Sequence, residues 1–218
     1  MTSNTCRMSL LIFCALATLG FAAPPLVQDL KDYPCVDGVN NVVTLADIDT
    51  AGTTVHVDGA VAHLYDLNGN PSCEKGKPMV AMPGLIRLVK GKVIVNEGTD
   101  IKKSGVAKWT FTKHKLIGTL CKDGEKVNIL IPDKFCKQDI YPLIGDDFAK
   151  MLATPGEYDL EVLLKTAGVT AEFKTPKLNT FVNGIVRGEW QTVLRFESEG
   201  KTLAHMKAPA NNDWLFFE

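Results

Sequence analysis

The sequence predicts an all-β protein, an antiparallel β-sandwich or β-cup with one short helical or looped segment at its rim. Short segments rich in Val, Ile, Thr, Phe and Trp follow one another from residue 39 onward, separated by Gly, Asn, Asp and Pro. Several of these segments alternate apolar and polar residues, as strands with one buried face do. The chain has 218 residues, of which 45% are hydrophobic, so it is long enough to bury a sizeable core.

An apolar segment precedes the β-rich region. It runs from residue 9 to residue 22 and follows Arg7, the only charged residue before Asp29. It is too short to span a bilayer, which disfavours the alternative of a membrane anchor. Gly20 and Ala22 are small residues at the two positions that a signal peptidase recognises. We therefore expect residues 1–22 to be a cleaved secretory signal.

Removal of this signal leaves four of the six cysteines, namely Cys35, Cys73, Cys121 and Cys136. In an oxidising compartment these predict two disulfides, for which three connectivities are possible. A metal site is less well supported, because no Cys-x-x-Cys pair or His-x-x-x-His spacing is present, and we expect no cofactor. The net charge of −1 for the whole chain indicates no nucleic-acid partner.

The alternation locates the strands in chain order, after an irregular lead-in over residues 23–34. Near the end, Glu199-Gly200 forms a turn between two apolar segments, which predicts a hairpin. The residues expected to share a face, strand by strand, are Trp109 and Phe111; Val127, Ile129 and Ile131; Tyr158, Leu160, Val162 and Leu164; and Trp190, Thr192, Leu194 and Phe196.

One segment, between Cys136 and Thr154, lacks this alternation. Asp146 has the residue type that caps a helix, and the following residues place Phe148, Met151 and Leu152 on one side. Pro155-Gly156 ends the segment. We therefore expect one short helical or looped element beside the second pair of cysteines.

Residues 83–207 carry an ordered series of short motifs. The series runs through Pro83-Gly84 and the alternating residues 85–91, Leu120-Cys121, a cysteine region up to Cys136 followed by residues 140–144, Pro155-Gly-Glu-Tyr158, Phe173-x-x-Pro176-x-Leu178, Gly188-Glu-Trp190 and Glu199-Gly-Lys-Thr-Leu203. In order and spacing it resembles the ganglioside activator proteins, which are secreted members of the ML lipid-recognition family. The resemblance implies an N-terminal extension with β segments over residues 23–82 and a lipid-recognition β-cup core over residues 83–218.

The cysteines depart from the pattern of that family. Its members typically carry eight cysteines, and His205 stands where the closing hairpin usually has the cysteine that ties the last strand to the first. From this comparison we expect the pairs Cys35–Cys73 and Cys121–Cys136. In a chain-entropy estimate each pair stabilises the fold by roughly 3–4 kcal/mol.

The resemblance also implies a function: a secreted or lysosomal protein that lifts a glycolipid or phospholipid from a membrane into an apolar cup and presents it to a soluble hydrolase such as a lysosomal glycosidase. It implies a lipid ligand and transient contact with a membrane surface. The expected lipid-binding residues are Trp109, Phe111, Ile129, Tyr158, Leu160, Val162, Trp190, Leu194 and Phe196. The expected membrane-contact rim is Ile140, Tyr141, Leu143, Ile144, Phe148, Met151, Leu152 and Phe181.

Other interpretations stay open from the residues alone. Alternating apolar residues fill the core of any sandwich, so the chain also fits a secreted structural or recognition module without bound lipid. The apolar residues of 140–152 equally fit a buried helix packed on the sheet. Catalysis is not expected, because neither Gly-x-Ser-x-Gly nor His-Glu-x-x-His occurs.

Overall fold

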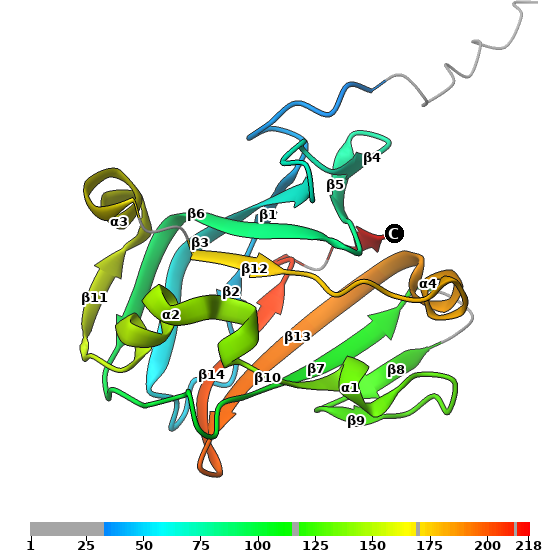
Figure 1. Ribbon diagram of the computed structural model, residues 1–218. Helices are drawn as coiled ribbons and strands as arrows, with labels where there is room; N and C mark the ends of the chain where they lie inside the picture. Colours follow the sequence, from blue (N-terminus) through cyan, green and yellow to red (C-terminus); the bar gives the residue numbers. More distant parts are fainter. Residues whose placement is uncertain (1–32, 115–117, 169–170, 212) are drawn as a thin grey trace, which may run out of the picture. The chain divides into compact units, whose positions relative to one another are not determined.

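Two β-sheets form the framework of a computed structural model that describes residues 33–114, 118–168, 171–211 and 213–218 (Figure 1). The expected secretory signal over residues 1–22 lies outside these residues. The first sheet runs β1 (Val42–Thr44), β3 (Val55–Asp66), β6 (Gly84–Val95) and β11 (Gly156–Asp159), and β12 (Ala171–Lys174) also pairs with β6. All of these pairings are antiparallel.

The second sheet is larger and is built around β13 (Gly188–Ser198). The path through it is β4 (Cys73–Glu74), β5 (Lys77–Val80), β15 (Leu215–Phe217), β13, β7 (Val106–Lys113), β8 (Thr119–Lys122) and β9 (Glu125–Lys126). β10 (Lys137–Asp139) pairs with β7, while β14 (Lys201–Ala208) pairs with β13 and with β2 (Ala46–Asp47). Among the described strands, β5 and β15 alone pair in parallel. The prediction of an all-β protein with antiparallel sheets is confirmed.

Residues 44–47 pass from one sheet to the other. Leu45 donates its backbone N–H to the carbonyl of Ala60 on β3, whereas the next two residues form β2 and pair with β14. The two layers are therefore joined along this side, and their inner faces meet in a common apolar interior.

The expected boundary at residue 82 does not separate two packing units. Residues 42–80 supply β1 to β5, and β3 lies between β1 and β6, pairing with β6 from Val55 to Asp66. Residues 33–218 form one compact unit. The β segments expected in the extension are present, and β3 is a central strand of the first sheet, because β6 would otherwise lack a partner along one edge.

The predicted hairpin near the end of the sequence is confirmed. β13 and β14 are joined at Glu199 and Gly200, whose φ angles of 51° and 79° are both positive, as a two-residue hairpin turn requires. Along β13 the predicted inward face is also correct, since Trp190, Thr192 and Phe196 are buried.

Two predicted strands are wrong. β9 ends at Lys126, and the next residues turn instead of extending, because the Asn128 side chain accepts a hydrogen bond from the Leu130 N–H (3.0 Å). Ile129 is consequently 87% exposed, whereas Ile131 is buried.

The second error concerns residues 158–164. The strand β11 ends at Asp159, and the helix α3 (Leu160–Ala167) begins directly after it. The Asp159 side chain caps this helix by accepting a hydrogen bond from the Val162 N–H (3.0 Å), and Gly168 ends it in the left-handed conformation. The capping residues outweighed the period-two pattern.

The predicted helix near Asp146 is present as part of α2 (Tyr141–Leu152), which is kinked at Gly145 (φ 72°). The other helices are α1 (Asp133–Cys136) and α4 (Thr180–Val186). Both expected disulfides are present: Cys35–Cys73 spans 38 residues, and Cys121–Cys136 spans 15.

Candidate functional site

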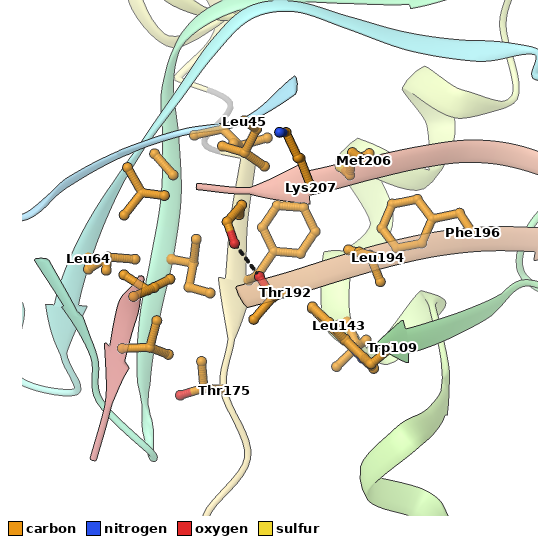
Figure 2. A pocket seen from close by; sticks show the side chains of 18 of the residues that line it. Leu45, Leu64, Trp109, Leu143, Thr175, Thr192, Leu194, Phe196, Met206 and Lys207 are labelled. Atoms are coloured by element: carbon orange, nitrogen blue, oxygen red, sulfur yellow. Dashed lines mark hydrogen bonds between the residues drawn. The ribbon is translucent and has the colours of Figure 1, made fainter. Parts of the chain in front are cut away.

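An apolar cavity of about 150 Å³ lies between the two sheets (Figure 2). Its walls come from the inward faces of strands in both layers, and helix α2 contributes on one side. The apolar residues that line it include Val55, Leu64, Ile86, Leu88, Trp109, Phe111, Leu143, Phe148, Phe173, Leu194, Phe196 and Met206. Alternation places the strand residues among them inside, because every second residue of a strand faces the same layer, whereas Leu143 and Phe148 come from α2.

Two polar groups of the wall are already satisfied. The Thr192 hydroxyl donates to the Ala208 carbonyl (2.7 Å), which Figure 2 shows as a dashed line. The Thr175 hydroxyl donates to the Ala81 carbonyl (2.6 Å) and accepts from the Gly84 N–H (2.6 Å). The donors of both hydroxyls are therefore used within the protein, and most of the wall is apolar, with Gln138, Lys174 and Lys207 as further polar lining residues.

Four of the predicted lipid-binding residues line this cavity: Trp109, Phe111, Leu194 and Phe196. The rings of Trp109 and Phe111 stack, with centroids 5.4 Å apart and an interplanar angle of 11°. These two side chains form a continuous aromatic portion of the wall.

The other predicted lipid-binding residues lie elsewhere. Ile129 and Val162 are exposed, because the first lies in a turn and the second on the outer side of α3. Trp190 is buried in the neighbouring core, where its indole N–H donates to the Val186 carbonyl. Tyr158 and Leu160 line a different hollow, described below.

The predicted membrane-contact rim is also corrected. Ile140, Ile144, Phe148, Met151 and Leu152 are buried, because the apolar face of α2 packs into the core between the sheets. Leu143, Phe148 and Leu152 line the cavity, and of these three only Leu143 keeps partial exposure to solvent. The alternative of a buried helix is the correct one.

Besides the partly exposed Leu143, two residues of the predicted rim keep solvent exposure on the side chain. Tyr141 is half-buried, and Phe181 at the start of α4 is 62% exposed. Sequence reasoning missed the exposed apolar side chains of Val127, Ile129 and Leu130 in the turn after β9, because it assigned that segment to a strand.

One group of partly exposed lining residues comes from β7, β10, α2 and the segment after β12. These residues are Trp109, Gln138, Leu143 and Pro176. Gln138 stands out because its side chain makes no hydrogen bond within the described residues. Its amide carries both donors and an acceptor at the edge of an apolar space. Sequence reasoning did not single out Gln138, and no motif around it indicated that it lines the cavity.

A second hollow, about 280 Å³, lies between α2, α3 and the strands β6 and β12. Its floor is apolar, and Asp147, Lys150 and Thr154 supply polar groups. Apolar residues lining it include Met151, Leu160, Leu163 and Ala171. Leu88 and Phe148 line both this cleft and the interior cavity.

The kinked start of α2 is held by a polar cluster. The Asp146 carboxylate accepts hydrogen bonds from the Lys102 ammonium (2.9 Å) and from the Tyr141 hydroxyl (2.7 Å). These two donors hold the pKa of Asp146 below its ordinary value, with the Lys102 bond as the larger cause. The cluster joins α2 to the loop between β6 and β7.

Ser104 and Ser198 share a hydrogen bond of 2.8 Å between their hydroxyls. Across the described ranges, no three His, Cys, Asp or Glu side chains converge as metal ligands. No helix in the described part of the chain is long and apolar enough to cross a membrane.

The fold and the site define a β-sandwich with an apolar cavity between its layers. No protein-family model and no curated protein matches the chain. The likeness to the ganglioside activator proteins therefore stays a prediction from the sequence motifs.

Proposed function

We propose that this protein is a non-catalytic lipid carrier that takes the acyl chain of a glycolipid or phospholipid into the cavity between its sheets. The observation that carries the proposal is the cavity itself, because a sandwich of this size ordinarily closes its interior with side chains. Its wall is almost entirely apolar, and its hydroxyl groups are already bonded within the protein.

Burial of an acyl chain supplies the driving force. Each methylene gains about 0.8 kcal/mol on leaving water, so a chain of ~16 methylenes gains on the order of 13 kcal/mol. A bilayer offers nearly the same gain. Exchange between membrane and protein is therefore close to balanced, which suits a carrier that both loads and releases its cargo.

The size of the cavity limits what it holds without rearrangement. Its volume of about 150 Å³ is below the roughly 300–1,000 Å³ of ordinary ligand sites. An engineered cavity of about this size accommodates benzene. A full acyl chain consequently needs either a wider separation of the sheets or further space next to the cavity.

Membrane contact and export are parts of the same proposal. Phe181 and the turn residues Val127, Ile129 and Leu130 are exposed apolar side chains that can enter a lipid surface. Two disulfides favour an oxidising compartment, which supports secretion or the lysosome. In either place the protein would present its lipid to a soluble hydrolase.

The test is to purify the protein from a eukaryotic secretion host and to examine it by native mass spectrometry and lipid extraction. We expect bound lipid in the wild-type protein and a strong loss in Leu194→Trp, which fills the cavity. Val193→Trp is the matched control, because Val193 is the neighbouring residue on the opposite face of β13. Absence of lipid from the wild-type protein, together with no uptake from vesicles, would favour a recognition module with a filled interior.

A further inference from the structure

The interior cavity and the cleft beside α2 are neighbours. Leu88 and Phe148 line both hollows, so these two side chains form the partition between them. Leu88 lies in the middle of β6, paired with Ala62 on one side and Ala171 on the other, and its backbone is fixed by both. Phe148 instead lies on a short helix, three residues after the kink at Gly145.

Phe148 is therefore the movable part of the partition. Its one aromatic contact is an edge-to-face pair with Phe173, and the rest of the buried ring packs against aliphatic side chains of the core. Rotation of the Phe148 side chain removes atoms from between the hollows without breaking any strand pairing. The helix backbone stays in place during such a change, because χ1 and χ2 alone move the ring.

We propose that the cavity and the cleft are two parts of one binding site for a single acyl chain with a polar head, and that Phe148 sets the length of chain the protein accepts. The inference rests on the proposed lipid-carrier function. The cavity alone is smaller than ordinary ligand sites, whereas the cleft adds about 280 Å³ and brings the joint space into their range.

The arrangement of polar groups gives the chain a direction. The Gln138 amide, which has no partner among the described residues, lies at the partly exposed edge of the cavity and can bond a carboxyl or ester group. The first methylenes then lie against Trp109 and Leu143. A short chain ends inside the cavity, and a longer one passes Phe148 onto the apolar floor of the cleft, over Leu160 and Leu163.

The probes are saturated fatty acids of 8 to 18 carbons and the matching lysophosphatidylcholines. Both carry one acyl chain, and comparison of the two series separates a free carboxyl from a phospholipid head. Affinities are measured on the delipidated full-length mature protein by displacement of a fluorescent fatty acid. Each methylene buried in the cleft contributes about fourfold in affinity.

Two variants test the chain-length role from opposite sides. Leu163→Trp fills the cleft, so we expect about 15-fold weaker binding of 16-carbon chains, the equivalent of two methylenes, and unchanged binding of 10-carbon chains. Leu164→Trp is the control, because Leu164 is exposed on the same helix and does not line the cleft. Phe148→Ala opens the partition and should raise the affinity ratio of 16-carbon to 10-carbon chains at least threefold.

Phe148→Leu should raise the affinity ratio of 16-carbon to 10-carbon chains by a smaller factor. It keeps the test possible if the alanine variant does not fold. If Leu163→Trp leaves 16-carbon chains unaffected and neither Phe148 variant changes the ratio, the inference is wrong while cavity binding stands. If the wild-type protein binds no chain of any length, the lipid-carrier function itself fails.

Discussion

Phe148 and Phe173 meet edge to face, with their ring centroids 5.8 Å apart and their planes at 69°. Phe148 belongs to α2, and Phe173 belongs to β12, which pairs with β6 in the first sheet. Both rings line the interior cavity. The contact thus joins the helix beside the cavity to the sheet that forms one of its walls.

A double-mutant cycle should detect this ring contact. We expect Phe148→Leu and Phe173→Leu to couple by about 1 kcal/mol in the free energy of unfolding, because edge-to-face pairs contribute beyond the area they bury. The measurement is denaturant unfolding of the two single variants and the double variant. The control cycle pairs Phe148 with Phe181, which is 62% exposed on α4 and does not line the cavity, and should give coupling near zero.

Fluorescence should report occupation of the cavity through one tryptophan. Trp109 lines the cavity, whereas Trp190 is buried outside it and Trp214 packs against His114 with a ring distance of 4.4 Å. A brominated fatty acid should therefore quench the wild-type protein, and Trp109→Phe should remove most of the quenching. Trp214→Phe should retain it. Equal quenching in both variants would place the ligand elsewhere.

The disulfide Cys121–Cys136 should contribute strongly to stability. Its closed loop of 15 residues corresponds to about 3 kcal/mol in the chain-entropy model. We expect the double variant Cys121→Ala/Cys136→Ala to lose about that amount in denaturant unfolding. Both side chains are fully buried, so alanine at both positions avoids the added cost of a lone polar group. A loss below ~1 kcal/mol would contradict the entropic account.

Asp146 should make stability depend on pH at the acidic end. Its pKa in the folded protein is lowered, first by the Lys102 hydrogen bond and then by Tyr141, so the ionised carboxylate stabilises the fold above the unfolded value of about 3.9. This contribution is lost as the pH falls through the folded pKa. We expect Asp146→Asn to be less stable than wild type near neutral pH and equally stable at the lowest pH. The measurement is denaturant unfolding across that range.

The control for this titration is Asp147→Asn. Asp147 is the next residue in the same helix, and its carboxylate lies 3.8 Å from the Lys150 ammonium instead of joining the Lys102 cluster. Its substitution should leave the acidic end of the profile as in wild type. If both variants gave the same pH profile, the loss of stability in acid would not come from the Asp146 cluster.

The hairpin turn between β13 and β14 should tolerate one substitution and resist another. Glu199 adopts a positive φ, which asparagine accepts more readily, so Glu199→Asn should stabilise the protein by about 0.5 kcal/mol. Gly200 also has a positive φ, and Gly200→Ala should cost about 1 kcal/mol. Thermal unfolding of the two variants should shift in opposite directions.

The sequence was most informative where the interior is built by two-residue alternation. The strands β7 and β13 and the hairpin to β14 follow directly from the pattern, and so do the cavity residues Trp109, Phe111, Leu194 and Phe196, whereas the pairing of β7 with β13 does not. The inward residues of β6 and β12, among them Ile86, Leu88 and Phe173, follow the same alternation and could have been included.

Residues near the helices were harder to predict, because local capping competes with alternation. Alternation alone predicts a strand with Leu160, Val162 and Leu164 on one face. In the structure Asp159 instead caps a helix that contains all three. Leu160 and Leu163 also have helical spacing, which together with Asp159 and Gly168 was an available signal. The burial of α2 depends on contacts with β12, which lie outside any local window of sequence.

The loop closed by Cys35 and Cys73 contains β1, β2 and β3. These strands leave the ribosome before β6 does. The nascent chain can therefore pair β1 with β3 and form the Cys35–Cys73 disulfide while the other edge of β3 still lacks a partner. An unpaired edge is a site for aggregation, and β3 is one of the two longest strands of the first sheet. We therefore expect the nascent chain to be most prone to aggregation before residues 84–95 are synthesised.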